Sequence, residues 1–196
     1  MSTSTPPRSA EAGLLSLPNA LTLARISAVP ALVGFFYLPG LAGVYASFVL
    51  FVAASVTDFL DGYLARRLNQ HSTLGRVLDP IADKLLIAAA LVLLAAFLRA
   101  PAIAVVAILC REVLIAGLRE ALAGRLMLHV SQLAKAKTAS QMTATALLLI
   151  APALGAGWFS ALGEALLWLA AALSWLSAAG YLRDAWDVIA GRTPVE

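Results

Sequence analysis

The sequence predicts an all-α, polytopic membrane protein with six transmembrane helices. Of its 196 residues, 61% are hydrophobic and only 13% are charged, whereas soluble domains carry about 45–50% apolar and about 25% charged residues. The apolar residues also gather in stretches close to the roughly 20 residues that a helix needs to cross a bilayer. The length fits a single transmembrane bundle.

Breaker residues divide the apolar sequence into its spans. Pro39 and Gly40 separate the first two spans, Pro101 opens the fourth, and Trp158 follows a segment rich in Pro and Gly that closes the fifth. Pro30 is expected to kink the first span, which membrane helices tolerate. The predicted spans are about 19–38, 43–66, 74–98, 101–122, 137–157 and 161–186.

The two ends of the chain are expected to lie outside the bundle. Residues 1–12 are polar and rich in Pro, Ser and Thr, which favours a disordered tail, and they lack the pattern of a signal peptide. Residues 10–18 could form a short amphipathic helix at the membrane surface. We therefore expect one transmembrane domain over residues 13–190 and a C-terminal tail over 191–196.

Basic residues gather at one end of the predicted bundle. The positive-inside rule then places both termini and both basic loops in the cytoplasm. The net charge of +3 on so apolar a chain suggests an anionic membrane surface or an anionic substrate, and no nucleic acid. Only Arg99 is evident on the opposite side, and the basic residues on the cytoplasmic side are Arg8, Arg66, Arg67, Arg76, Arg125, Lys135, Lys137, Arg183 and Arg192.

Four aspartates stand close to the apolar spans. A single Asp at a helix centre costs about 2.5–3.5 kcal/mol, so four facing lipid would cost on the order of 10–14 kcal/mol. They must therefore face each other, water or a cation. Asp58 and Asp61 share a helix face, as do Asp79 and Asp83. A loop of roughly ten residues would turn one helix back beside the other, so that all four carboxylates converge.

These carboxylates predict a metal site. Hard oxygen donors with no His or Cys nearby favour magnesium, manganese or calcium, and two divalent ions would neutralise four carboxylates. Two-metal sites commonly serve displacement at phosphorus. Gly62, Ala65 and Gly75 leave room for a bulky ligand to approach the backbone, and Arg66 can pair with a phosphate in two-pronged fashion.

The alternative is that the aspartates are helix caps and surface charges. Asp79 before Pro80 could be an N-cap with proline at the first helical position, and for Asp79 alone both interpretations are equally good. Caps do not require Asp58 and Asp61 one turn apart inside an apolar span, which favours the metal site for the set.

The aspartate segment resembles the signature of the CDP-alcohol phosphatidyltransferases. The pattern D-x2-D-G-x2-A-R-x8-G-x3-D-x3-D is present with every spacing intact, at Asp58, Asp61, Gly62, Ala65, Arg66, Gly75, Asp79 and Asp83. The resemblance implies a six-helix membrane fold, usually a homodimer, in which an alcohol attacks the phosphate of a CDP-linked lipid and CMP leaves. It also implies that the aspartates hold two Mg²⁺ or Mn²⁺ ions and that Asp83 is in addition the base.

Two further segments carry conspicuous polar residues. In "LPNALTLAR", the alternatives to ligand contact are an N-cap for Asn19, a hydroxyl bonded to its own helix for Thr22 and an interfacial side chain for Arg25. In "REVLIAGLRE", Arg111 lies in mid-span and shares a face with Glu112 and Arg119. A mid-span arginine faces a cavity or a partner, and two arginines on one stripe suggest an anion such as phosphate.

A third segment, "AKAKTASQM", carries two lysines. Lys135 and Lys137 read singly are membrane anchors, but with Arg111 and Arg119 they could complete a phosphate pocket. The family resemblance implies that Gly62, Ala65, Arg66 and Gly75 line the CDP-lipid site, and we add Asn19, Thr22 and Asp61 to it. The acceptor-phosphate site would comprise Arg25, Arg111, Arg119, Lys135 and Lys137.

These three segments resemble the bacterial phosphatidylglycerophosphate synthases, a branch of the same family. That resemblance implies CDP-diacylglycerol and glycerol 3-phosphate as substrates, CMP as a product, and a place in the bilayer of the bacterial cytoplasmic membrane with the site on the cytoplasmic side. Relatives that use inositol phosphate are the near alternative. A small transporter with an acidic cation site is the alternative from another class, although transporters favour midplane sites and repeated halves. A purely structural subunit would leave the matched spacings unexplained.

Overall fold

The computed structural model describes residues 17–68, 73–122, 132–190 and 192, and within these ranges it is built entirely from helices. The side chains of residues 17–21, 58–80, 83, 132 and 134 lie outside the description. The elements are α1 (Leu17–Phe36), α2 (Gly40–Leu68), α3 (Thr73–Ala96), α4 (Ala102–Ala121), α5 (Gln132–Leu154) and α6 (Gly157–Ile189).

The predicted all-α class and the predicted positions of six helices are confirmed. The largest difference at a helix start is in α5, which begins at Gln132, before the lysines, because the polar residues of this segment are good helix formers. Helix α1 continues through Pro30. The predicted tails fall almost wholly outside the described residues, and the predicted surface helix overlaps them only at Leu17 and Pro18, where α1 begins.

Two of the described helices are long and apolar enough to cross a membrane. They are α2, through Gly40–Thr57, and α6, through Gly157–Ile189. Shorter apolar stretches cover Thr22–Phe36 of α1 and Lys84–Ala96 of α3. Charged and polar residues interrupt α4 and α5. The composition thus fits a membrane protein, whereas within the described residues length and hydropathy identify two spans and not six.

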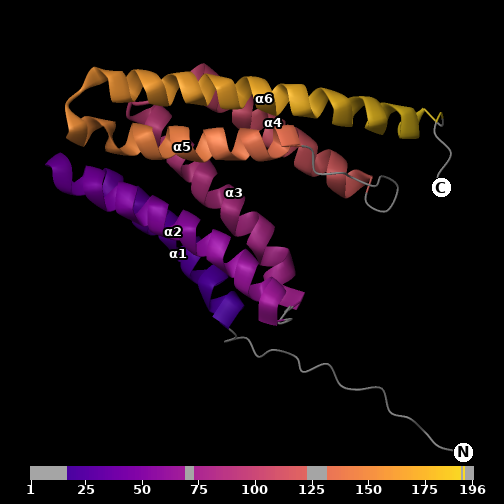
Figure 1. Ribbon diagram of the computed structural model, residues 1–196, viewed down its shortest axis with the longest axis horizontal. Coiled ribbons are helices and arrows are strands. Elements are labelled where there is room, and N and C mark those ends of the chain that lie inside the picture. The colour runs from indigo at the N-terminus through magenta and orange to yellow at the C-terminus, as the bar shows by residue number, and fades with distance from the viewer. Residues whose placement is uncertain (1–16, 69–72, 123–131, 191, 193–196) are drawn as a thin grey trace, which may run out of the picture.

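The helices form two groups that share α2 and α3 as a link. Helix α1 packs on α2 and α3, while α6 packs on α4 and α5, and α2 and α3 also contact α5. Figure 1 shows α5 and α6 running antiparallel side by side, with α3 crossing between the two groups. The ends of α2, α4 and α6 and the starts of α1, α3 and α5 all point toward the same side of the bundle (Figure 1).

Close packing of small and branched side chains holds α5 against α6. Leu148 is 1% exposed, and a Cβ added to Gly163 would lie 2.8 Å from the Leu148 Cγ, so only glycine allows this approach. The Ser140 Oγ donates to the Leu166 carbonyl at 2.9 Å. Gly155, with φ of 64°, makes the tight connection between the helices.

The predicted ten-residue loop is wrong, and so is the alternative that Asp79 is an N-cap. Helix α3 begins at Thr73, so Asp79 and Pro80 lie inside it, two turns from its start, and the chain between α2 and α3 comprises residues 69–72. Proline removes only its own N–H from the helical ladder, and membrane helices tolerate that loss. No glycine or proline lies between Gly62 and Leu68, so α2 continues to Leu68.

Candidate functional site

The four aspartates lie at adjoining ends of two helices. Asp58 and Asp61 belong to the second half of α2, and Asp79 and Asp83 belong to the first half of α3. The two helices contact each other and are joined by residues 69–72. The backbone therefore brings both pairs to the same end of the bundle, as the sequence predicted.

The donor chemistry of this set fits hard divalent cations. The predicted metal ligands are the side chains of Asp58, Asp61, Asp79 and Asp83, which lie outside the described residues. Among the side chains that are described, no group of three or more His, Cys, Asp or Glu could hold a metal. Four carboxylates with no His or Cys beside them in sequence match Mg²⁺ or Mn²⁺, so the predicted group fits this place in the fold.

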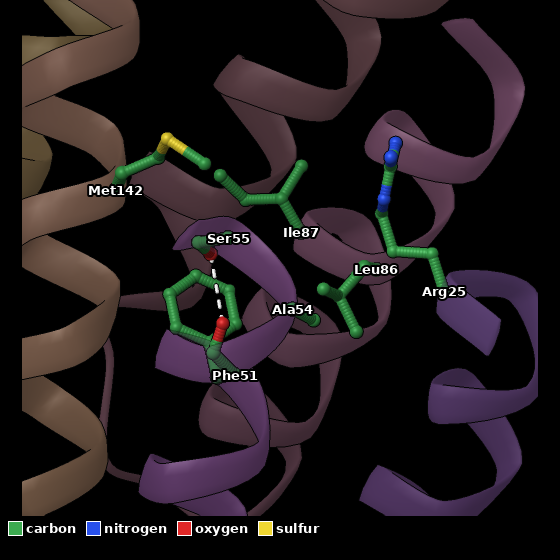
Figure 2. A pocket seen from close by; sticks show the side chains of 7 residues that line it. All are labelled: Arg25, Phe51, Ala54, Ser55, Leu86, Ile87 and Met142. Atoms are coloured by element: carbon green, nitrogen blue, oxygen red, sulfur yellow. Dashed lines mark hydrogen bonds between the residues drawn. The ribbon is translucent and has the colours of Figure 1, made fainter. Parts of the chain in front are cut away.

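A small cavity lies between residues of α1, α2, α3 and α5 (Figure 2). Its volume is about 20 Å³, room for a single water. Ala54 precedes Asp58 by one turn of α2, and Ile87 follows Asp83 by one turn of α3. Figure 2 shows Met142 of α5 and Arg25 of α1 on opposite sides of it. The lining residues are Arg25, Phe51, Ala54, Ser55, Leu86, Ile87 and Met142.

The described polar residues of α1 are buried. Thr22 is 1% exposed and Arg25 is 4% exposed, so Arg25 does not extend to the surface as the interfacial alternative requires. Arg25 lies on the cavity wall with α2 and α3, whereas the other predicted acceptor residues lie on α4 and α5. The side chain of Asn19 lies outside the described residues, as do those of Gly62, Ala65, Arg66 and Gly75.

Arg111 and Lys137, predicted to share a pocket, are brought together through Glu112. Both cations are 8% exposed. The Arg111 Nη1 donates to the Glu112 Oε1 at 3.1 Å, and the Lys137 Nζ donates to the same oxygen. One carboxylate oxygen thus joins a cation of α4 to a cation of α5.

Arg111 is also bound to α6. Its Nε donates to the Ser174 carbonyl at 2.9 Å, and its Nη2 donates to the Ser177 Oγ at 2.7 Å. The Ser177 hydroxyl in turn donates to the Ser174 carbonyl at 2.8 Å. Sequence reasoning did not identify Ser177. The available signal was a pair of serines three residues apart in an otherwise apolar span.

Arg119 and Lys135 lie nearer the helix ends, and both are exposed. Arg119 is in the last turn of α4. It follows Arg111 by eight residues, which is about 12 Å along a helix, so the two arginines do not form one compact cluster. Arg119 and Lys135 therefore lie nearer the ends of α4 and α5, where they are exposed, than the buried Arg111 and Lys137.

The two serines of α6 provide a matched test of this arrangement. Ser177→Ala removes a hydrogen bond to a buried cation, and we expect it to lower the free energy of unfolding by about 1–2 kcal/mol. The hydroxyl of Ser174 has no hydrogen-bond partner among the described residues, although Ser174 is 0% exposed. Ser174→Ala keeps the carbonyl that binds Arg111, so it should leave stability unchanged or raise it. Thermal unfolding in detergent measures both; equal destabilisation by the two variants would contradict the assigned contacts.

Comparison with known proteins places this arrangement in a family. The model of the CDP-alcohol phosphatidyltransferase family matches residues 15–176. A protein of Rickettsia bellii named CDP-diacylglycerol–glycerol-3-phosphate 3-phosphatidyltransferase is 40% identical over 171 residues, covering 86% of this chain and 94% of the relative. An Arabidopsis thaliana protein with that name, chloroplastic/mitochondrial form 1, is 41% identical over 194 residues, covering 90% of this chain.

The plant relatives are longer than this chain. The chain spans 64% of the Arabidopsis protein's length. A rice protein named cardiolipin synthase (CMP-forming) is 39% identical over 199 residues, covering 90% of this chain and 59% of the relative. The family match includes α2 and α3 with all eight signature positions. The chain therefore belongs to the CDP-alcohol phosphatidyltransferase family.

Proposed function

We propose that the chain transfers the phosphatidyl group of CDP-diacylglycerol to glycerol 3-phosphate, giving phosphatidylglycerophosphate and CMP. The observation that carries the proposal is the intact aspartate signature on adjoining ends of α2 and α3. Relatives about 40% identical over most of the chain bear the name of this activity, and one of them matches it over nearly its full length.

We assign the donor side of the site to α1, α2 and α3. Asp58, Asp61, Asp79 and Asp83 would hold two Mg²⁺ or Mn²⁺ ions. When bound, these ions would supply positive charge that polarises the phosphoryl oxygens and neutralises the carboxylates. The assigned CDP-lipid residues are Asn19, Thr22, Asp61, Gly62, Ala65, Arg66 and Gly75. Glycine and alanine at consecutive turns of α2 would let the nucleotide approach the helix backbone, and Arg66 would pair with its phosphates.

The chemistry is one direct displacement. The acceptor hydroxyl oxygen forms a bond to the phosphorus that carries diacylglycerol, and the bond from that phosphorus to the CMP oxygen breaks. Asp83 takes the hydroxyl proton, and CMP leaves with the electron pair. Neither the sequence motifs nor the described residues offer a Ser, Cys or His arranged as a nucleophile, so no covalent enzyme intermediate is needed.

We assign the acceptor phosphate to basic residues of α4 and α5, together with Arg25 of α1, which lines the small cavity that Met142 of α5 also lines. Arg111 and Lys137 share one Glu112 oxygen, so this trio keeps a net charge of +1 when all three are ionised. Arg119 and Lys135 are exposed at the end of the same region. An anion that approaches from these helix ends would contact Arg119 and Lys135 first, and Arg111 and Lys137 next.

A substitution of Arg119, in the last turn of α4, tests the acceptor assignment. Arg119→Ala should lower acceptor efficiency about ten- to a hundredfold, because a hydrogen bond to a charged group contributes about 1.5–3 kcal/mol. The change should appear in the KM for glycerol 3-phosphate and not in the KM for CDP-diacylglycerol. Arg119→Lys should recover part of the loss, since an ammonium lacks the planar fork. Glycerol should be a poor acceptor for the parent and should lose little more in the variant.

Arg183→Ala is the matched control, because Arg183 is an exposed arginine of α6 outside the assigned site. It removes the same charge without removing an assigned contact. Equal weakening of both substrates by Arg119→Ala, or an unchanged KM for glycerol 3-phosphate, would show that Arg119 does not bind the acceptor.

The overall proposal is tested by CMP release from CDP-diacylglycerol with different acceptors. We expect glycerol 3-phosphate to be used in preference to inositol phosphate and serine. Cardiolipin synthesis is a second candidate, favoured by the match to the rice protein, and phosphatidylglycerol as acceptor tests it. Absence of CMP release with every acceptor would contradict the family reaction and leave a transporter as the alternative.

We further propose that all six helices cross the bilayer of a bacterial cytoplasmic membrane, with both termini and the site on the cytoplasmic side, and that the enzyme is a homodimer. The alternating direction of the helices supports this orientation (Figure 1). The aspartates, Arg119 and Lys135 then lie toward one membrane surface, where CMP and glycerol 3-phosphate are available.

A further inference from the structure

Glu112 occupies an unusual position between two buried cations. Its Oε1 accepts from the Arg111 Nη1 at 3.1 Å and from the Lys137 Nζ. The side chains of both cations are 10% exposed, and that of Glu112 is 21% exposed. A carboxylate that served only to neutralise one mid-span charge would need one cation, so the second cation calls for another explanation.

The contacts of the two cations are unequal. Arg111 makes two hydrogen bonds to α6, to the Ser174 carbonyl and the Ser177 hydroxyl, and these do not involve Glu112. For Lys137, Glu112 is the acceptor that the described part of the chain provides. Removal of the carboxylate would therefore leave Arg111 held by α6 and would release the ammonium.

The N–H donors of Arg111 and Lys137 that these contacts leave unused indicate what the two cations could bind. An ammonium has three N–H donors and a guanidinium has five. Glu112 takes one donor from Lys137, while Glu112, Ser174 and Ser177 take three from Arg111. Counted over the described residues, two donors remain on each cation, and the trio carries one surplus positive charge. Such a pair, held side by side, suits an anion with several oxygens.

We propose that Glu112 is a positioning residue for the acceptor. It fixes the Lys137 ammonium beside Arg111, so that the remaining donors of both cations meet the phosphate of the acceptor together. The inference rests on the proposed function, and it assigns to Glu112 a role that differs from ligand contact: the carboxylate holds the cations and does not touch the anion.

Accessibility of Lys137 gives a test that needs no activity. Amine-reactive labelling of the detergent-solubilised protein, quantified by mass spectrometry, compares Lys137 with Lys135, which is exposed on the same helix. In the parent, Lys137 should label far more slowly than Lys135. Glu112→Gln should raise the ratio of Lys137 to Lys135 labelling, because the ammonium loses its ionic partner. Glu120→Gln, the same change at an exposed position of α4, should leave the ratio unchanged.

Kinetics then separate positioning from folding. Glu112→Gln should raise the KM for glycerol 3-phosphate about ten- to a hundredfold, the size expected for a lost hydrogen bond to a charged group, with the KM for CDP-diacylglycerol unchanged. Glu112→Asp keeps the charge but is shorter by one methylene, about 1.5 Å. Its carboxylate cannot hold both cations, so its KM should approach that of the glutamine variant.

Several outcomes would overturn the role of Glu112. They are parental kinetics in Glu112→Asp, equal losses for both substrates in Glu112→Gln, and an unchanged labelling ratio for Lys137. A parent that releases CMP only with another alcohol would instead overturn the proposed acceptor. The same variants are then compared with that alcohol, and labelling of Lys137 remains a direct test of positioning.

Discussion

Asp83→Asn is expected to abolish turnover while the protein remains folded. Asparagine cannot take the proton of the acceptor hydroxyl and is a weaker ligand for a divalent cation. General-base catalysis contributes about a hundred- to ten-thousandfold, so CMP release should fall by at least that amount. The fold should persist, because the variant removes one of four carboxylates that the backbone of α2 and α3 brings together.

The measurement is CMP release at saturating concentrations of both substrates, beside thermal unfolding of the same preparation. Asp184→Asn is the matched control, since Asp184 is exposed on α6 and lies outside the assigned site. A near-normal rate in purified Asp83→Asn would exclude Asp83 as the base. A variant that fails to fold would show instead that the Asp83 carboxylate is needed for the structure of α3.

Removal of divalent metal is expected to lower the rate of CMP release at least as much as Asp83→Asn does. Four carboxylates at adjoining helix ends repel one another without cations, so a chelator should eliminate activity, and magnesium or manganese should restore it. Calcium should support little turnover, because its longer and looser coordination positions the reactants less accurately.

Chelator already saturated with magnesium controls for effects of the chelator itself. Activity should then be retained. Full turnover after exhaustive chelation, with no metal detected by elemental analysis, would rule out the proposed two-metal site and leave the signature aspartates without an assigned function.

The helices were predictable because their signals are local. Apolar stretches of membrane-spanning length, interrupted at Pro39, Gly40 and Pro101, define most of the boundaries. The predicted start of the third span at about 74 agrees with the α3 start at Thr73, whereas the alternative of a cap at Asp79 before Pro80 was wrong. No helix-breaking residue lies between Gly75 and Asp79, so α3 extends back to Thr73. Pro80 inside the helix costs one backbone hydrogen bond.

The surroundings of Arg111 were only partly predictable. A mid-span arginine requires a partner, and Glu112 is next to it in sequence, so this pair could be anticipated. The approach of Lys137 was also suggested by charge. The contacts with Ser174 and Ser177 could not be foreseen, because they join residues 63 and 66 positions apart and depend on how α6 packs against α4.

The contacts of Arg111 with α6 have a consequence for synthesis of the chain. Ser174 and Ser177 emerge from the ribosome 63 and 66 residues after Arg111. At about 5–20 residues per second, this is a delay of about 3–13 s. An arginine at the centre of a membrane helix costs about 2.5–3.5 kcal/mol during insertion. Glu112 is made immediately after it, and Lys137 follows Glu112 by 25 residues. For the proposed membrane-spanning α4, the counter-ion of the arginine is therefore synthesised first, its ammonium neighbour next, and its two acceptors on α6 last.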